Sequence, residues 1–288
     1  MYRGNNLFKK ILVTGGYGVI GSYVTEIFNK SKIILMDKNS LDVSKKSHVL
    51  KHMKKYQPDL VIHLAALTDV DMCEKNEKLA MKINFKGTEH VARACKEFDI
   101  PLVYISTSVV FNGMNSPSIG YTEEDKTSPI NIYGKTKLLG EEIIRKLVKN
   151  HLIVRIGWLI GGAEKEKKFI KHVFRKIKNG ETVYAVNDIF GTIAYGKDLM
   201  GFVKNRLDND EFGLYHFACE GSCSRFDMAL YLKELLHSQS KIIPVNASLF
   251  KDSFPAPRPK HQVLKSIKKP IKRDWKDALA EYVETELL

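Results

Sequence analysis

The stretch Thr14–Gly21, TGGYGVIG, decides the fold of this chain of 288 residues. Its glycines Gly15, Gly18 and Gly21 follow the spacing G-x-x-G-x-x-G. An apolar, β-branched run, KKILVTG, leads into it, and the following GVIGSYVTEIFNK carries apolar residues at helical spacing. A glycine-rich turn between a strand and a helix lets the backbone approach a pyrophosphate and packs the helix against the strand. The stretch therefore predicts a nucleotide-binding loop rather than a merely structural turn.

Outward from this loop, strand-like and helix-like segments alternate through the first half of the chain. Near-continuous apolar strands separated by amphipathic helices are typical of a parallel sheet covered on both faces. We therefore predict an α/β fold with a doubly wound parallel sheet of the Rossmann type. The predicted strands are 9–15, 32–37, 58–66, 101–107 and 151–158, and the predicted helices are 18–30, 77–99 and 130–150.

The alternation loosens after Trp158. We predict a dinucleotide-binding domain at 1–157 and a smaller C-terminal α+β substrate domain at 158–288, which lends elements around 190–218 back to the first domain. In this second part the predicted helices are 169–179, 197–207, 224–237 and one from residue 274 onward, and the predicted strands are 182–186 and 213–218.

Composition and charge narrow the range of partners. The chain is 44% hydrophobic and 27% charged, which is ordinary for a globular protein, and its net charge is +13. The lysines are scattered, with no aromatic-rich RNA motif or zinc finger among them. We therefore predict no nucleic-acid partner, and instead a solvated basic surface that attracts an anionic small molecule.

The sequence predicts neither a membrane segment nor a metal site. Its longest apolar run, 60–67, is far shorter than the roughly 18 residues of a membrane span. Only a short apolar segment precedes the glycines, so we expect no signal peptide and a cytoplasmic protein. His216, Cys219 and Cys223 lie close together, but a second ligand pair at zinc spacing is missing. The four cysteines make no disulfide framework.

An acidic residue ends the second predicted strand. Asp37 lies roughly 20 residues beyond the loop, where a carboxylate can bind a ribose hydroxyl of NAD. Lys38 follows it directly and could instead accommodate the phosphate of NADP. The choice between NADH and NADPH stays open at this point.

The segment IYGKTK places Tyr133 and Lys137 one helical turn apart, on one face of a predicted helix. A free phenol has a pKa of ~10, which a neighbouring ammonium group lowers. A hydroxyl from Ser106, Thr107 or Ser108 ends the fourth predicted strand, at the sheet edge where ligands bind in such folds. These groups suit proton transfer at a carbonyl while a nicotinamide carries hydride. Without other evidence, Tyr133 and Lys137 would be interpreted as ordinary helix residues. Because they follow a predicted dinucleotide-binding loop, a catalytic role is favoured.

These residues resemble those of a known family, the extended short-chain dehydrogenases/reductases, and within it the branch that reduces sugar nucleotides. The resemblance runs along nearly the whole chain. It rests on GGYGVIG, LDVS (41–44), PDLVIHLAALTDVDMCE (58–74), INFKGTEHVARAC (83–95), ISTSVVFNG (105–113), SPINIYGKTKLLGE (128–141), VRIGWLIG (154–161) and RPKHQVL (258–264).

The resemblance implies roles for particular residues. Thr107, Tyr133 and Lys137 would be the catalytic triad, and Asp42 would lie by the adenine. Ser108, Val109, Trp158 and Arg258 would lie on the substrate side. Together with the loop and Asp37, the predicted cofactor-binding residues are Gly15, Gly18, Val19, Ile20, Gly21, Asp37, Asp42, Val43, Ala65, Ala66, Thr68, Tyr133 and Lys137.

The chain departs from the family pattern at two places. Where the family has Ser-Thr-Asp-Tyr-Val-Phe, this sequence has Ser108 and Val109 in place of the acid and the aromatic ring. Where the family has Thr-Ser/Ala-Trp-x-Tyr-Gly, it has Gly157 before the tryptophan and Ile160 in place of the phenol. The triad is retained, so we still expect catalytic activity. The two departures leave the identity of the sugar open.

We predict an NAD(P)H-dependent reductase of a nucleoside-diphosphate 4-keto-6-deoxy sugar, in which Tyr133 protonates the oxygen. Two alternatives stay open. One is a sugar-nucleotide epimerase or dehydratase with bound NAD, although a dehydratase needs acid/base groups that Ser108 and Val109 do not supply. The other is a non-catalytic dinucleotide-binding regulatory subunit, like that of methionine adenosyltransferase. The sugar, the base and the oligomeric state, with a homodimer among the alternatives, are not determined.

Overall fold

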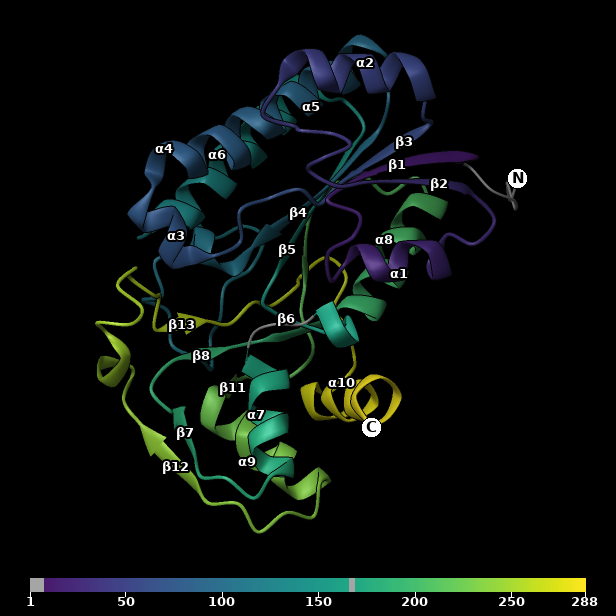
Figure 1. Cartoon of the computed structure of the whole chain (residues 1–288). Helices are drawn as coiled ribbons and strands as arrows, with labels where there is room; N and C mark the ends of the chain where they lie inside the picture. The colour runs from purple at the N-terminus through teal and green to yellow at the C-terminus, as the bar shows by residue number, and fades with distance from the viewer. Residues whose placement is uncertain (1–7, 166–168) are drawn as a thin grey trace.

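A six-stranded parallel sheet forms the centre of the structure, a computed structural model that describes residues 8–165 and 169–288 (Figure 1). Its strand order is β10-β5-β4-β3-β1-β2, and every neighbouring pair is parallel. The predicted doubly wound parallel sheet is confirmed. Residues 1–7, on which the expectation about a signal peptide rests, lie outside the described residues. The strands are β1 (Lys10–Thr14), β2 (Lys32–Met36), β3 (Leu60–His63), β4 (Leu102–Thr107), β5 (His151–Ile156) and β10 (Gly213–Phe217).

Helices cover both faces of this sheet. One face carries α2 (Lys46–Tyr56), α5 (Gly87–Glu97) and α6 (Ile132–Leu147), and the other carries α1 (Gly21–Ile27) and α8 (Gly196–Asp208) (Figure 1). Successive strand residues point to opposite faces. In β1, accordingly, Leu12 joins the buried cluster under α2, α5 and α6, whereas Ile11 and Val13 join the cluster that contains α1 and α8.

Helix α2 was not predicted from the sequence. Its residues, KSHVLKHMKKY, are mostly lysine, histidine and other polar groups, and only Val49 and Met53 are buried. The apolar stripe is therefore too sparse to indicate a helix by its period. The sheet topology explains why a helix forms here, because the connection between the parallel strands β2 and β3 must cross over one face of the sheet, usually as a helix.

The helix predicted at 77–99 consists of three segments. Helix α4 (Glu77–Ala80) follows α3 (Val70–Lys75) and leads into a π-helix, η1 (Met81–Lys86), before α5 begins. Short π-helical turns often occur at functional sites. Asn84, inside η1, is 1% exposed and directs its side chain to the loop after β3.

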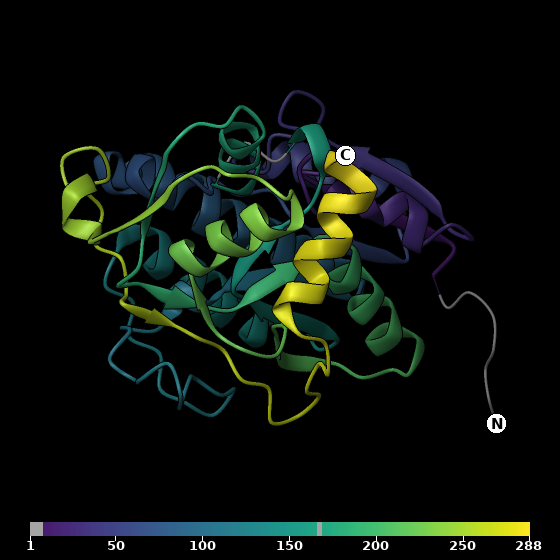
Figure 2. The ribbon, with the colours of Figure 1, turned by 90° about the horizontal axis from the view of Figure 1, so that it is seen from below.

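The C-terminal part combines small sheets with helices (Figures 1 and 2). Residues beyond 158 contribute to the large sheet and to its cover, because β10 is a strand of that sheet and α8 packs on one of its faces. The boundary at 157/158 stays a prediction. In the described residues, no helix has the length and apolar character needed to cross a membrane. The small sheets are β6 (Trp158–Ile160) with β9 (Ile193–Tyr195), β7 (Val183–Val186) with β12 (Ile242–Val245), and β11 (Cys223–Ser224), β8 (Phe190–Gly191) and β13 (His261–Gln262). The remaining helices are η2 (Ser108–Val110), η3 (Ala163–Lys165), α7 (Phe169–Lys178), α9 (Arg225–Leu235), η4 (Ala247–Phe250), α10 (Trp275–Tyr282) and η5 (Val283–Leu287).

Candidate active site

The glycine loop lies between β1 and α1, at the carboxyl edge of the sheet. Gly15 has φ +65°, and a Cβ there would lie 2.7 Å from the Ala65 amide nitrogen, so only glycine fits. At Gly21 a Cβ would lie 2.0 Å from the Gly16 carbonyl oxygen. Gly18 is exposed, and a Cβ would meet only the Gly15 oxygen, at 3.3 Å. The loop thus leaves its backbone open at Gly18, which fits the close approach of a pyrophosphate.

Two of the predicted cofactor residues are carboxylates held by local turns. Asp37, directly after β2, accepts hydrogen bonds from the amide and hydroxyl of Ser40, and these bonds lower its pKa. Asp42 accepts from the Ser44 amide at 3.0 Å and hydroxyl at 2.7 Å, and the pKa of Asp42 is likewise lowered, first by the Ser44 hydroxyl. Both groups are therefore anionic at neutral pH. Val43 beside them is buried against Gly87.

The loop after β3 brings the next predicted cofactor residues beside the glycine loop. The Ala65 amide donates to the Thr14 hydroxyl at 3.3 Å, Ala66 is half-buried, and Thr68 is exposed. Asn84 fixes the position of this loop. Its side chain accepts from the Leu67 amide at 2.7 Å, donates to the Leu67 carbonyl at 3.0 Å, and donates to the Thr136 hydroxyl on α6 at 3.1 Å.

Asn84 was not singled out in the sequence, although it lies within the motif INFKG. The available signal was an asparagine in an otherwise helical pattern, since asparagine competes with the backbone for hydrogen bonds there. Its contacts join the loop after β3 to the helix that carries Tyr133 and Lys137.

The three predicted catalytic residues come from β4 and α6, and the side chains of Tyr133 and Thr107 form a hydrogen bond where β4 ends. Thr107 is the last residue of β4, and Tyr133 and Lys137 are one turn apart in α6. Lys137 is 4% exposed, and its ammonium nitrogen lies 3.9 Å from the centroid of the Tyr104 ring, a cation–π contact. Lys135, by contrast, is exposed.

Glycine in α6 makes this meeting possible. A Cβ at Gly134 would lie 2.2 Å from the carbonyl oxygen of Val109, so the helix packs directly on the backbone of the turn after Thr107. The Val109 amide donates to the Thr107 hydroxyl at 3.2 Å. Backbone contact between Gly134 and Val109 therefore sets the distance between Tyr133 and Thr107.

Burial dominates the titration of the two ionisable groups. It raises the pKa of Tyr133, the nearby Cys73 adds to this rise, and a hydrogen bond with the Thr107 side chain offsets part of it. Burial also lowers the pKa of Lys137 to about 7, while the charge of Glu141 acts in the opposite direction. The expected lowering of the Tyr133 pKa by Lys137 is therefore not found: burial is the largest cause of the shift, and Lys137 is not among its causes. The phenol is protonated at neutral pH.

A buried ion pair supports the helix beneath Lys137. Glu141 is fully buried and accepts from Nε and Nη2 of Arg155 at 2.9 and 2.7 Å. It also accepts from the Ser106 hydroxyl at 2.5 Å. This network joins α6, β4 and β5 next to the triad. Neither Glu141 nor Arg155 was predicted as a site residue, because partners 14 positions apart leave no local pattern.

On the substrate side, the two departures from the family pattern have structural counterparts. Ser108 is 1% exposed, and its hydroxyl has no hydrogen-bond partner among residues 8–165 and 169–288. At Gly157 a Cβ would lie 2.1 Å from the Thr192 carbonyl oxygen, so this backbone leaves no room for the family's side chain. Ile160 is fully buried. The indole nitrogen of Trp158 donates to the Gln262 side chain at 3.3 Å.

Arg258, which was predicted to lie on the substrate side, is paired with a carboxylate of the chain itself. Instead of presenting a free fork for a diphosphate, its guanidinium forms a two-pronged ion pair with Asp71 of α3, with Nη1 to Oδ1 at 2.7 Å. The segment around it is also tied to the start of α6, because the Asn131 side chain donates to the Pro257 carbonyl at 2.8 Å. Arg258 therefore lies close to the helix of Tyr133, with Asp71 as its partner in this structure.

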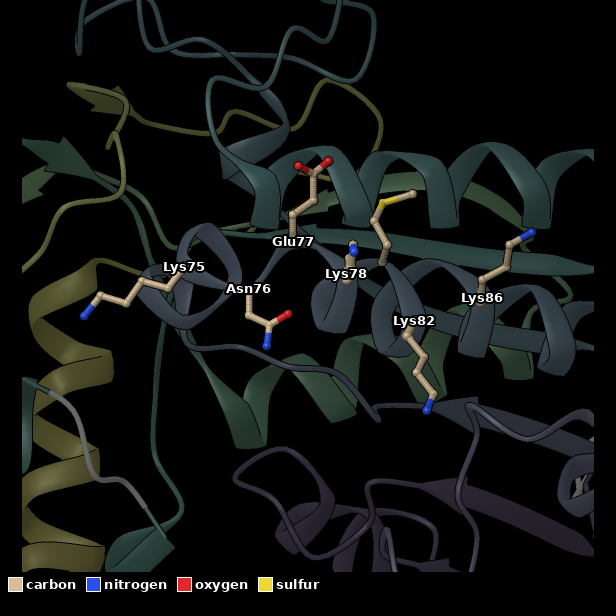
Figure 3. Close-up of a pocket in the computed structure, with 7 residues that line it drawn as sticks. Lys75, Asn76, Glu77, Lys78, Lys82 and Lys86 are labelled. Carbon is tan, nitrogen blue, oxygen red and sulfur yellow. The ribbon is translucent and has the colours of Figure 1, made fainter.

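A hollow of about 740 Å³ lies along α4 and η1 (Figure 3). None of its residues was predicted as a site residue. Lys82 is near enough to Asp42 to contribute to the lowering of that pKa. The hollow is therefore basic and adjoins the predicted adenine side, where it attracts anions. Its lining residues are Lys75, Asn76, Glu77, Lys78, Met81, Lys82 and Lys86.

In the part of the chain that the structure describes, no three or more His, Cys, Asp or Glu side chains group closely enough to hold a metal ion. His216 contacts the backbone carbonyls of Tyr121 and Lys265 instead. Cys219 and Cys223 are buried free thiols.

A doubly wound sheet with this glycine loop and a Thr-Tyr-Lys site at the end of β4 defines an extended short-chain dehydrogenase/reductase. The chain belongs to the family described as the RmlD substrate binding domain, whose model matches residues 9–287. It is 31% identical over 281 residues to the spore coat polysaccharide biosynthesis protein SpsK of Bacillus subtilis (strain 168), covering 96% of this chain and 97% of that protein.

Two solved structures are similar over nearly their whole length. The dTDP-4-dehydrorhamnose reductase of Yersinia enterocolitica has a TM-score of 0.89 and 37% identity, covering 96% of this chain and 99% of that one. The dTDP-4-dehydrorhamnose reductase of Bacillus anthracis str. Ames, in complex with NADP, has a TM-score of 0.90 and 32% identity, with the same coverage of 96% and 99%.

Proposed function

We propose that this chain is an NADPH- or NADH-dependent reductase that converts the 4-keto group of a nucleoside-diphosphate 4-keto-6-deoxy sugar, dTDP-4-dehydrorhamnose, to an alcohol. The observation that carries the proposal is the meeting of Tyr133 and Thr107 beside a buried Lys137, in a family whose solved members include dTDP-4-dehydrorhamnose reductases. Bound NADPH or NADH supplies the hydride.

The residues of the chain provide binding and the proton. In this proposal Gly15, Gly18 and Gly21 bind the pyrophosphate, and Asp37 and Asp42, whose lowered pKa values keep them anionic, bind on the adenosine side. An acid acts only in its protonated state, and burial keeps the Tyr133 phenol in that state at neutral pH.

Thr107 acts on the carbonyl oxygen of the substrate, and Lys137 acts on Tyr133. The Thr107 hydroxyl orients the substrate carbonyl beside the phenol. As the C–O double bond becomes a single bond, the proton moves from Tyr133 to the sugar oxygen and leaves a phenolate. In its protonated form, which the charge of Glu141 favours against burial, Lys137 stabilises that phenolate.

The two alternatives from the sequence are less well supported. A dehydratase needs acid/base groups after Thr107, where the chain has a buried serine hydroxyl and a valine. A regulatory subunit would not need the retained triad. A cytoplasmic location and a homodimer stay predictions.

The test is single-turnover oxidation of NADPH with dTDP-4-dehydrorhamnose, followed by nicotinamide absorbance. Tyr133→Phe keeps the ring and removes the acid, so turnover should fall by ~10²–10⁴-fold, with NADPH binding retained by calorimetry. A Tyr133→Phe variant with wild-type turnover would remove the tyrosine from the mechanism. A wild-type protein that binds NADPH but reduces no 4-keto sugar nucleotide would favour the regulatory alternative.

A further inference from the structure

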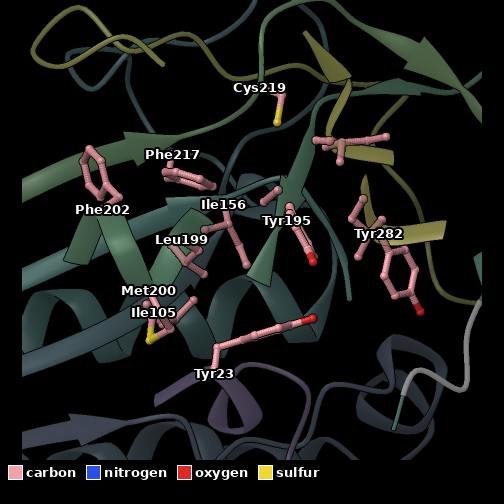
Figure 4. Close-up of a cluster of buried hydrophobic side chains, with 14 of the residues drawn as sticks. Tyr23, Ile105, Ile156, Tyr195, Leu199, Met200, Phe202, Phe217, Cys219 and Tyr282 are labelled. Atoms are coloured by element: carbon pink, nitrogen blue, oxygen red, sulfur yellow. The ribbon is translucent and has the colours of Figure 1, made fainter. Parts of the chain in front are cut away.

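Glu286, in the π-helix η5, joins four parts of the chain through its carboxylate. Oε1 accepts from the phenols of Tyr23 on α1, at 2.6 Å, and Tyr195 on β9, at 2.7 Å. Oε2 accepts from the amides of Gly162 and Ala163, both at 2.9 Å, and the Gly162 amide also donates to the Tyr23 hydroxyl at 2.5 Å. Figure 4 shows the phenol oxygens of Tyr23 and Tyr195 directed toward the same space. Burial first and then Glu286 raise the pKa of both phenols, so both remain donors.

The loop that Glu286 binds has an unusual backbone. Gly161, Gly162 and Ala163 all have positive φ, at +112°, +86° and +45°. This region is unfavourable for a residue with a Cβ, such as Ala163. Two successive amides that converge on one oxygen form an anion-binding nest. The carboxylate of Glu286 occupies this nest and so stabilises the loop conformation.

The same loop packs on the start of α1. A Cβ at Gly162 would lie 3.0 Å from Cγ1 of Val19, which belongs to the glycine loop. A Cβ at Gly161 would lie 2.3 Å from the hydroxyl of Tyr23, two residues beyond Gly21. Figure 2 shows the C-terminal helix running to this part of the molecule. The shape of the glycine loop therefore depends on a loop that Glu286 holds.

We propose that Glu286 is a positioning residue for the dinucleotide site: its carboxylate holds Gly161–Ala163 against Val19 and α1 and keeps the glycine loop in its cofactor-binding shape. The inference rests on the proposed function in one respect, since it takes the glycine loop as the dinucleotide site. None of the four hydrogen bonds involves Tyr133, Lys137 or Thr107. The loss of Glu286 should consequently weaken cofactor binding without slowing the chemical step.

The experiment compares Glu286→Leu with Glu284→Leu, the same change at an exposed carboxylate of the same π-helix. NADPH affinity is measured by calorimetry, and kcat is measured with both substrates saturating. We expect Glu286→Leu to raise the Kd for NADPH by roughly 3- to 30-fold, the range found for residues that act through a packed network, with kcat unchanged. Glu284→Leu should match the wild type.

Two further variants keep the test informative if Glu286→Leu folds poorly. Glu286→Gln retains an oxygen for the two amides, and its NH2 group can donate to a tyrosine hydroxyl, so much of the affinity should return. Tyr195→Phe removes one donor and should give a smaller rise in Kd. Hydrogen exchange at the Ala163 amide, which donates to Glu286, should be faster in Glu286→Leu than in Glu284→Leu.

Equal NADPH affinity and equal exchange in the two leucine variants would overturn the inference and leave Glu286 as a residue that only stabilises the C-terminal helix. The proposed function would survive that result. A wild-type protein that does not bind NADPH at all would overturn the proposed function and, with it, the role of Glu286.

Discussion

Gly134→Ala tests whether backbone contact sets the distance between Tyr133 and Thr107. The added Cβ would lie 2.2 Å from the Val109 oxygen and 3.0 Å from Cβ of Pro129. Since non-bonded heavy atoms pack best at about 3.5 Å, the helix or the turn must move by about 1 Å. Tyr133 lies on the moving helix and Thr107 two residues before the contacted carbonyl, so the two side chains separate.

The size of the effect follows from this movement. A misplacement of about 1 Å can reduce turnover by about 10²-fold, and overpacking costs about 1–3 kcal/mol of stability. Alanine favours a helix interior by roughly 0.5–1 kcal/mol over glycine, which offsets part of that cost. We therefore expect Gly134→Ala to lose about 1–2 kcal/mol of stability and about 10²-fold in kcat/KM, by nicotinamide absorbance and urea unfolding.

Gly201→Ala is the matched control. Gly201 also lies within a helix, α8, but a Cβ there would have nothing within 4 Å. This variant should gain roughly 0.5–1 kcal/mol of stability and keep wild-type kcat/KM. If Gly134→Ala retained wild-type kcat/KM, contact with the Val109 carbonyl would not position the tyrosine, and the reasoning would be refuted.

Four other predictions use the same assays. Lys137→Met should reduce turnover, whereas exposed Lys135→Met should leave it unchanged; equal rates would exclude a role for Lys137. Burial lowers the pKa of Lys137 from 10.5 to about 7, so the unfolded chain binds more protons than the folded chain between these pH values. Lys137 therefore makes the free energy of unfolding of the wild type rise with pH from about 7 to 10.5. Urea unfolding of Lys137→Met at several pH values should lack this contribution. Gly18→Val should abolish NADPH binding with the fold retained, since a Cβ there meets only the Gly15 oxygen; unchanged affinity by calorimetry would contradict the loop assignment. Arg258→Ala should raise the KM for the sugar nucleotide far more than the Kd for NADPH, and identical kinetics would leave Arg258 only as the structural partner of Asp71.

The sequence alone determined the features that depend on neighbours in the chain. The glycine spacing between an apolar run and a helical pattern indicated the loop, and the apolar runs indicated the parallel strands, because backbone conformation and periodicity are local properties. The spacing of Tyr133 and Lys137 likewise placed them on one face of α6. Helix α2 lacked such a local signal, since its apolar residues are too few.

Tertiary structure decided which groups are buried and which distant residues they meet. The pairing of Arg258 with Asp71 joins residues 187 positions apart, and Glu286 reaches Tyr23 across 263 positions. The titration of the active site was decided in the same way. An adjacent lysine predicts a lowered pKa for Tyr133, but desolvation of the phenol raises it. Desolvation and long-range pairing depend on how the elements pack in three dimensions, and no local pattern of residues carries that information.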